Sequence, residues 1–594
     1  MFDEMKYIGE MLMLRNGFYW RNREMRQHVR VIDGEVAPTI VLKNATYLNT
    51  YTKQWLKAVI WIYEDRIVYV GNQMPANLHN AEIVDCKGKY IVPGYVEPHA
   101  HPFQLYNPEQ LALHAAKTGT TTLINDNLLW LFMLDKKKAF SILEEFSKHP
   151  VSMYWWARFD PQTELQGEKE LDLFQTEDVL AWIKHPAVLQ GGELTSWPDL
   201  LAGDDILLYW IQETKNQRKP VEGHFPGASE RTLTKMKLLG VNADHESISG
   251  EEVMRRLRLG YHVGLRHSSI RPDLPKLIEE ILAAGLTTFE NVSFTTDGAT
   301  PSFYEAGLIN QCIEIAIEKG IPVEEAYLMG SYYAAKHLRM EEQLGSIAPG
   351  RFAHINILPE KHIPKPESVL AKGKWIVKGG EQQKIKPHIQ WQAYQIKPLD
   401  LDWELSNKEL QFSVPIGLEM ANDVIMTPYP IEVDITVEEL PAETTDAFLL
   451  LLDRNGKWRV NTTLRGFTNQ LGAIASSYSV SGDFIFIGKR KSDILLAGKR
   501  LKELGGGIVI VHQGKVLLEI PLALGGMMFA GEMDELIGKE KELKQILQSF
   551  GYPFSDPVYT IFFLSSTHLP YIRITPLGLM DVKKKELLFP ATMC

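Results

Sequence analysis

The chain has 594 residues, which is too long for one hydrophobic core and predicts roughly two to four domains. Its formal net charge of −11 supplies no general attraction for phosphate backbones, so we expect no nucleic-acid partner. Apolar residues make up 45% and charged residues 23% of the chain, which is typical of a globular protein and excludes one dominated by disorder.

The first part of the chain predicts a small β unit that follows a helical start. Residues 1–36 are polar and predict an N-terminal helical extension. Residues 37–95 contain short β-branched runs separated by turn residues, such as "TIVLKNATYLNT" and "AVIWIYEDRIVYVG". Residues 345–390 return to this texture in "SIAPGRFAHINIL" and "VLAKGKWIVKGG". We therefore expect the two segments to pair as one small β-sandwich domain that is discontinuous in sequence.

Between these segments, residues 96–344 alternate short apolar strands with longer amphipathic stretches. "NPEQLALHAAKTG" and "DVLAWIKHP" predict helices, whereas "TTLIND" and "AVLQGGE" predict strands. This alternation predicts an α/β fold, either a TIM-type (β/α)₈ barrel or a doubly wound open sheet. Polar residues at the ends of several predicted strands favour the barrel, because only a barrel brings those ends to one mouth.

The last part of the chain, residues 400–594, predicts a further α/β domain. "DFIFIG" has the composition of a strand, and "SDILLAGKRLKELGG" predicts a helix that ends at Gly505–Gly507. "GIVIVHQGKVLLEIP" predicts a hairpin with its turn at Gln513 and Gly514.

The spacing of the cysteines and the hydropathy of the chain predict the cellular compartment of the protein. The three cysteines (Cys86, Cys312, Cys594) lie far apart and form no CxxC pattern, which favours a reducing compartment over a disulfide framework. No run of about 18 apolar residues occurs, and the first residues carry charges throughout. We expect a cytoplasmic protein with no membrane span.

The segment "IVPGYVEPHAHP" ends a strand-like run with two histidines, His99 and His101. Alternate side chains of an extended strand share a face, so both imidazoles can reach one metal ion. An isolated HxH is more often a pair of unrelated surface or packing histidines. The pair therefore predicts a metal site only if other ligands meet it.

Four further residues occupy equivalent strand ends, namely Glu193 in "GGELTSW", His224 in "EGHFPG", His245 in "ADHES" and Asp297 in "TTDGATP". Each alone has a structural explanation, such as a helix cap, a core histidine or a turn residue. Six such residues at matching positions of consecutive βα units are hard to obtain by chance. Nitrogen and oxygen ligands without thiolate suit Zn, Mn or Fe, and the set is large enough for two ions bridged by Glu193.

Such a site can activate water for attack on a carbon that carries nitrogen. The departing nitrogen is a poor leaving group until it is protonated. Asp297 could accept the proton of the water and deliver it to that nitrogen, so we assign catalytic roles to Asp297 and Glu193.

These motifs, with "GTTTLIND" (Gly119 to Asp126) and the later "RGFTNQLGAIASSYSV" and "ITPLGLMDV", resemble the adenine deaminase family of the amidohydrolase superfamily. The similarity spans nearly the whole chain beyond the first few dozen residues. It implies purine metabolism and the conversion of adenine to hypoxanthine and ammonia at a binuclear Mn- or Fe-type centre. It also implies metal ligation by His99, His101, Glu193, His224, His245 and Asp297.

The substrate pocket departs from the family pattern. Phe103 stands where the family has an acid, Asp126 is followed by "NLL" in place of Pro-His-Glu, and His267 replaces a glutamate. "DGATP" and "YSVSGD" likewise lack the family's charged or histidine residues. The reaction type is therefore predicted more firmly than the ring on which it acts. The candidate substrate contacts are Arg266, His267, Ser269 and Asp126.

Three functions remain open from the sequence. A deaminase of adenine or a related heterocycle leads, and a cyclic-amide or other C–N hydrolase with a non-purine substrate is the nearest alternative. A non-catalytic ligand-binding homologue is the third, but it has little need for several desolvated charges near one another. We expect a small-molecule substrate and a homodimer. The aromatic run "MYWWARFD" (Met153 to Asp160) predicts a buried barrel strand.

Overall fold

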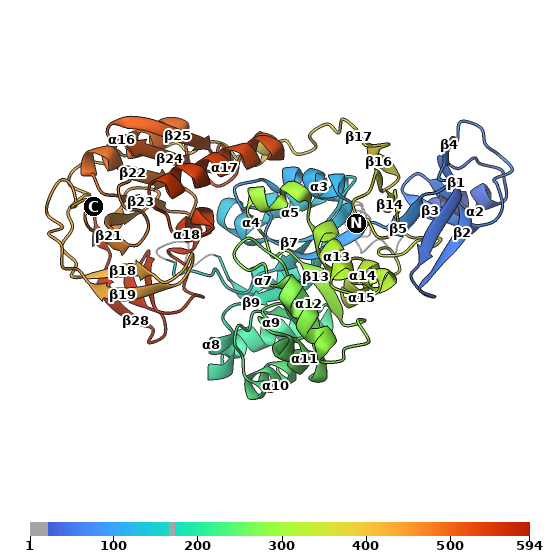
Figure 1. The fold of residues 1–594 in the computed structure, drawn as a ribbon, viewed down its shortest axis with the longest axis horizontal. Helices are drawn as coiled ribbons and strands as arrows, with labels where there is room; N and C mark the ends of the chain where they lie inside the picture. The colour runs from blue at the N-terminus through green and yellow to red at the C-terminus, as the bar shows by residue number, and fades with distance from the viewer. Residues whose placement is uncertain (1–21, 166–172) are drawn as a thin grey trace, which may run out of the picture.

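A computed structural model describes residues 22–165 and 173–594. Figure 1 shows three units in a row, with the barrel in the middle, the small β domain at one end and the C-terminal domain at the other. Of the helical extension expected over residues 1–36, residues 1–21 lie outside the described residues, and the remainder contains helix α2 (Asn22–Ile32).

The small β domain is one mixed sheet built from both predicted segments. Its order is β17-β16-β15-β14-β5-β1-β2-β3, with β4 also on β1. Strand β14 pairs antiparallel with β5, which joins the two segments. The strands are β1 (Ile40–Asn49), β2 (Gln54–Tyr63), β3 (Arg66–Gly71), β4 (Glu82–Asp85), β5 (Tyr90–Pro93), β14 (Ile355–Leu358), β15 (Ser368–Ala371), β16 (Lys374–Lys378) and β17 (Glu381–Gln382).

The middle unit confirms the predicted barrel. Eight parallel strands follow one another in the order β6 to β13, and all of their described residues apart from Tyr154 are buried because helices cover the outside. The strands are β6 (Tyr95–Ala100), β7 (Thr120–Asp126), β8 (Ser152–Ala157), β9 (Val188–Leu194), β10 (Val221–Gly223), β11 (Ala243–Asp244), β12 (His262–Arg266) and β13 (Val292–Thr295). The run from Met153 therefore forms a barrel strand, as expected.

Several helices of the barrel begin at a side chain that accepts a backbone hydrogen bond. Asn107 caps α3, and Ser229 and Ser249 cap α10 and α11 in the same way. The helices are α3 (Pro108–Lys117), α4 (Leu128–Met133), α5 (Lys136–Ser147), α7 (Thr176–Lys184), α8 (Trp197–Ala202), α9 (Asp205–Asn216), α10 (Glu230–Leu238), α11 (Gly250–Arg258), α12 (Leu274–Ala283), η1 (Pro301–Ala306), α13 (Ile309–Glu318), α14 (Val323–Met329) and α15 (Tyr332–His337).

A buried carboxylate joins the first barrel strand to the last. Glu97 of β6 accepts hydrogen bonds from Thr295 Oγ1 at 2.7 Å and from Thr296 N and Oγ1 at 2.9 and 2.6 Å. Burial raises the pKa of Glu97 to about 7, although these donors favour its charged form. Side-chain bonds thus link β13 to β6, between which the described residues form no strand ladder.

The C-terminal domain contains a mixed sheet, a small antiparallel sheet and three helices. As predicted, Gly505 closes helix α16 as its C-cap. The β24–β25 hairpin turns at Gln513 and Gly514, which both have positive φ. Its elements are β18 (Ile416–Met420), β19 (Met426–Pro430), β20 (Asp446–Leu452), β21 (Trp458–Arg465), β22 (Ala473–Ser476), β23 (Phe484–Gly488), α16 (Lys491–Leu504), β24 (Gly507–His512), β25 (Lys515–Pro521), α17 (Met533–Ser549), α18 (Pro557–Phe563), β26 (Ile572–Thr575), β27 (Gly578–Asp581), β28 (Glu586–Pro590) and β29 (Thr592–Met593), and the short helix η2 (Trp391–Tyr394) precedes them.

The C-terminal domain is fastened to loops at the mouth of the barrel. Phe529 N donates to Leu105 O at 2.6 Å, and Asn107 Nδ2 donates to Phe529 O at 2.9 Å. Helix α17 packs against η1, which follows the last barrel strand. The domain therefore borders the mouth.

Within the described ranges, no helix combines the length and the apolar character that crossing a lipid bilayer requires.

Candidate metal centre

Each of the eight barrel strands brings a charged or imidazole side chain to its carboxyl end. The strands are parallel, so these ends lie on the same side of the barrel. The residues are His99 and His101 (β6), Asp126 (β7), Arg158 (β8), Glu193 (β9), His224 (β10), His245 (β11), Arg266 (β12) and Asp297 (β13).

The six residues expected as ligands lie together. Asp297 Oδ1 is 3.1 Å from His101 Nε2 and 3.4 Å from His99 Nε2, so the two histidines of β6 do share a face. Glu193 Oε1 is 2.6 Å from His224 Nδ1 and 3.6 Å from His245 Nε2.

Among the described residues, four groups of three have ligand atoms within 4.8 Å of one another. Glu193 belongs to two of them, and the groups are His99, His101 and Glu193; Glu193, His224 and His245; His99, Glu222 and His245; and His245, Glu246 and Asp297. Even the most accessible of the six side chains, that of His224, is only 14% exposed. The cluster is therefore shielded from bulk water.

A glycine allows the loop after β13 to approach β6. Asp297 and Gly298 have φ values of 48° and 71°, in the left-handed region that favours glycine. A Cβ atom at Gly298 would lie 2.5 Å from His101 Cβ. The "DG" pair thus brings the Asp297 carboxylate next to His101.

Several imidazole nitrogens of the cluster are buried without a hydrogen-bond partner. They are His99 Nδ1, His99 Nε2 and His245 Nε2. Buried polar atoms of this kind are uncommon in native proteins and call for an explanation such as a bound ion. Neutral imidazole nitrogens beside carboxylate oxygens form the donor set that divalent transition metals favour, so the residues fit a metal.

The electrostatics of the cluster also favour a cation. Burial lowers the pKa of an imidazole, yet hydrogen bonds and charges of Asp126 and Asp297 raise that of His101 to about 9. Burial alone would raise the pKa of Asp297, but the Arg266 guanidinium and the nearby histidines hold it well below its usual range. The carboxylates thus remain ionised and attract positive charge.

Asp126 is buried and supports both a histidine and an arginine. Its Oδ2 lies 2.9 Å from His101 Nδ1 and accepts from Arg158 Nη2 at 2.7 Å. Arg158 Nη2 also contacts Glu193 Oε2 at 3.0 Å. With Nδ1 of His101 donating to Asp126, its Nε2 is left with the lone pair on the side of Asp297.

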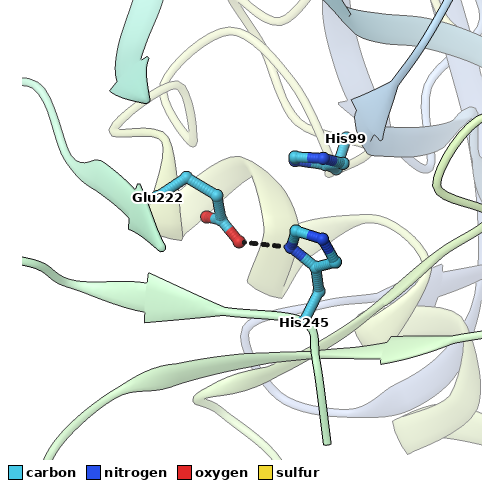
Figure 2. Close-up of side chains that lie close together, drawn as sticks. All are labelled: His99, Glu222 and His245. Atoms are coloured by element: carbon cyan, nitrogen blue, oxygen red, sulfur yellow. Dashed lines mark hydrogen bonds and ion pairs between the residues drawn. The ribbon is translucent and has the colours of Figure 1, made fainter. Parts of the chain in front are cut away.

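A second carboxylate, Glu222, contacts Nδ1 of His245 as Asp126 contacts Nδ1 of His101. Figure 2 shows Glu222 pointing at the ring of His245, with the His99 ring above that of His245, and Glu222 Oε1 is 3.1 Å from His245 Nδ1. Nε2 of His245 then faces Glu193. Trp156 stacks on the His99 ring, with centroids 4.3 Å apart, and restricts that ring as well.

The four residues expected to contact substrate divide into two pairs. Asp126 belongs to the cluster, and so does Arg266, whose Nη1 lies 2.7 Å from both Asp297 Oδ2 and Glu246 Oε1. His267 and Ser269 make no hydrogen bond or ion pair with the six ligand-type residues. His267 packs near Phe303, with centroids 5.2 Å apart, and Ser269 Oγ accepts from Thr300 N at 3.5 Å.

Four residues near the cluster were not singled out from the sequence, namely Arg158, Glu222, Glu246 and His568. The expectation that polar residues at the carboxyl ends of the strands meet at one mouth could have identified Arg158, which directly follows β8. Glu222 could have been identified because it shares a strand face with His224. No periodic pattern in the sequence singles out Glu246. His568 lies in the C-terminal domain, 5.4 Å from His224 between ring centroids, and only the docking of that domain brings it there.

Comparison with known proteins agrees with this geometry. Residues 90–379 match the Amidohydrolase family, and residues 426–586 match the Adenine deaminase C-terminal domain. A protein of Oceanobacillus iheyensis is 60% identical over 98% of this chain and 100% of its own. One of Bacillus cereus is 53% identical over 97% of this chain and 98% of its own, and both carry the name "Putative adenine deaminase".

Among solved structures, a beta-aspartyl dipeptidase of Fervidobacterium islandicum AW-1 matches 58% of this chain and 99% of its own, with 16% identity and a TM-score of 0.45.

The barrel, the strand-end cluster and the family match define a hydrolase of the amidohydrolase class, which acts on C–N bonds. Within that class, the identity over nearly the full chain shows that the protein belongs to the adenine deaminase family. The resemblance found in the sequence motifs is thereby confirmed.

Proposed function

We propose that this protein hydrolyses adenine to hypoxanthine and ammonia at a metal centre in the barrel mouth. The observation that carries the proposal is the convergence of four histidines and two carboxylates from the ends of five strands. The names of relatives that are 60% and 53% identical support adenine as the substrate.

We propose His99, His101, Glu193, His224, His245 and Asp297 as the metal ligands, with Glu193 between two divalent ions. Its membership of two of the four groups, one with His99 and His101 and one with His224 and His245, supports this position. The donor set accommodates Mn, Fe or Zn, and manganese or iron is the family expectation. A divalent ion held by these residues would supply Lewis-acid chemistry, which would lower the pKa of a water molecule and polarise the bond that is attacked.

Asp297 moves the proton in this proposal. Its Oδ2 is held by Arg266 at 2.7 Å, while Oδ1 faces His101 and His99. Arg266 keeps the carboxylate charged and fixed, so it is ready to take the proton of the attacking water. The same carboxyl then gives that proton to the nitrogen leaving carbon 6 of adenine, which departs as ammonia.

We propose Arg266 as a residue at the edge of the substrate pocket, together with His267 and Ser269. The buried contacts of Asp126 with His101 and Arg158 support a positioning role, and a direct substrate contact by Asp126 stays a prediction. The proposed setting is purine metabolism in the cytoplasm, which the free cysteines favour. A homodimer also stays a prediction, and light scattering of the purified protein would test it.

The test combines metal analysis with turnover. The purified protein is loaded with Mn²⁺, Fe²⁺ or Zn²⁺, its metal content is measured, and adenine is supplied while the ultraviolet spectrum is followed to hypoxanthine. We expect turnover that a chelator abolishes, and His99→Asn should lose bound metal and activity together. A fully metal-loaded protein that leaves adenine unchanged but hydrolyses a cyclic amide would contradict adenine as the substrate.

A further inference from the structure

One segment of the C-terminal domain reaches the barrel mouth beside the proposed metal ligands. It follows α18 and lies against the loop after β8. Thr163 Oγ1 donates to Ser565 O at 2.7 Å, and Gln162 O accepts from Thr567 N and from Ser566 Oγ, both at 3.0 Å. Three hydrogen bonds thus fix this segment to the barrel.

The segment presents the imidazole of His568 to the mouth. Its ring is perpendicular to that of His224, with centroids 5.4 Å apart, and the Phe563 ring supports it at 5.5 Å. His568 belongs to none of the groups whose ligand atoms lie close enough to share an ion, among the residues that the structure describes. It therefore lies beside the metal ligands without being one of them.

The hydrogen bonds of His568 determine which of its nitrogens carries the proton. Ser566 Oγ is 2.7 Å from His568 Nδ1, and the same hydroxyl donates its single proton to the carbonyl of Gln162. The Ser566 oxygen must then accept from Nδ1–H. In the neutral imidazole this leaves Nε2 with a lone pair and no proton.

Nε2 of His568 is available to a ligand. Among the described residues it has no hydrogen-bond partner, and it is not one of the polar atoms sealed in the interior without a partner. His568 therefore offers a hydrogen-bond acceptor from a ring that lies beside His224. This acceptor favours a ligand that carries a hydrogen-bond donor, such as an N–H group.

We propose that His568 contacts the substrate and that its Nε2 accepts a hydrogen bond from an N–H group of the heterocycle. The inference rests on the proposed deamination, because adenine carries N–H groups on its exocyclic amine and on its five-membered ring. Several of the family's acids and histidines are replaced in the barrel loops of this chain. A contact from the C-terminal domain would compensate for part of this loss in substrate binding.

The test uses two substitutions in the full-length, metal-loaded protein. His568→Leu removes the acceptor, and we expect kcat/KM for adenine to fall roughly 10- to 100-fold, mainly through KM. His568→Gln can place a carbonyl oxygen near the position of Nε2 and should recover part of that loss. Metal content should equal that of the wild type in both variants. His362→Leu, the same change at an exposed histidine, is the matched control and should leave the kinetics unchanged.

Two inhibitors identify the N–H group. Purine lacks the exocyclic amine of adenine, and 9-methyladenine lacks the ring N–H. Whichever analogue lacks the contacted group should bind the wild type and His568→Leu equally, whereas the other should bind the variant more weakly. An equal loss for both analogues, or unchanged kinetics with adenine, would overturn the proposed contact.

Failure of the proposed substrate gives a different result. If the wild type leaves adenine unchanged, the deaminase proposal fails, and the His568 contact is then tested by calorimetric binding of adenine and the two analogues. Equal affinity of wild type and His568→Leu for all three, or no binding of any of them, overturns the contact as well.

Discussion

Replacement of Asp126 by asparagine tests a residue that supports the proposed metal ligands without being one of them. The wild-type carboxylate accepts three hydrogen bonds from Arg158 and lies 2.9 Å from His101 Nδ1, with no exposed surface. Asparagine keeps the shape but loses the charge. We therefore expect a weaker hold on both partners while all six proposed ligands are retained.

The contacts give the size of both effects. Breaking a buried ion pair and leaving one charge uncompensated costs about 3–5 kcal/mol. Arg158 keeps its 3.0 Å contact with Glu193, so we expect a loss near the lower end, about 3 kcal/mol of unfolding free energy. Loss of a carboxylate that orients a ligating histidine lowers metal affinity about 10- to 100-fold, so Asp126→Asn should do the same.

Urea unfolding of the metal-free protein measures the first effect, and competition with a chelator measures the second. Asp135→Asn is the matched control, because this exposed helix cap tolerates asparagine as well as aspartate. Unchanged unfolding energy and unchanged metal affinity in Asp126→Asn would refute the assignment of Asp126 as the support of His101 and Arg158.

Three further changes test other parts of the site. Gly298→Ala should lower the melting temperature and the retained metal, because its Cβ would lie 2.5 Å from His101 Cβ, and normal metal content would contradict this. Binding of Mn²⁺ or Fe²⁺ should quench tryptophan fluorescence, and Trp156→Phe should remove most of the change, since Trp156 stacks on His99. Burial, with the Glu540 charge, raises the pKa of Asp556 to about 6, against the Lys544 charge. The protonated form is therefore favoured in the folded state, so unfolding free energy should fall as the pH rises from about 4 to about 6, and Asp556→Asn should flatten this slope in urea titrations. An unchanged slope would exclude Asp556 as its source.

The barrel and the meeting of the six ligand-type residues could be predicted from the sequence because both follow from local rules. Strand and helix periods identify βα units, and parallel strands bring their ends to one mouth. His99, Glu193 and Asp297 could therefore be grouped although they lie nearly two hundred residues apart. The same rule applied to every strand would also have included Arg158.

The remaining features depend on packing between distant segments. Asp126 was expected to contact substrate, and its burial against Arg158 becomes visible only when the packing of neighbouring strands is known. His568 reaches His224 because one domain docks on another, and no period in the sequence encodes docking. Ionisation is also set by surroundings, as the effect of Arg266 on Asp297 illustrates.

Anomalous X-ray diffraction from crystals of the metal-loaded protein would show where the metal binds. We expect anomalous peaks at the absorption edge of the metal within ligand distance of His99, His101, Glu193, His224, His245 and Asp297. Metal bound at another site, with this cluster empty of anomalous signal, would contradict this expectation.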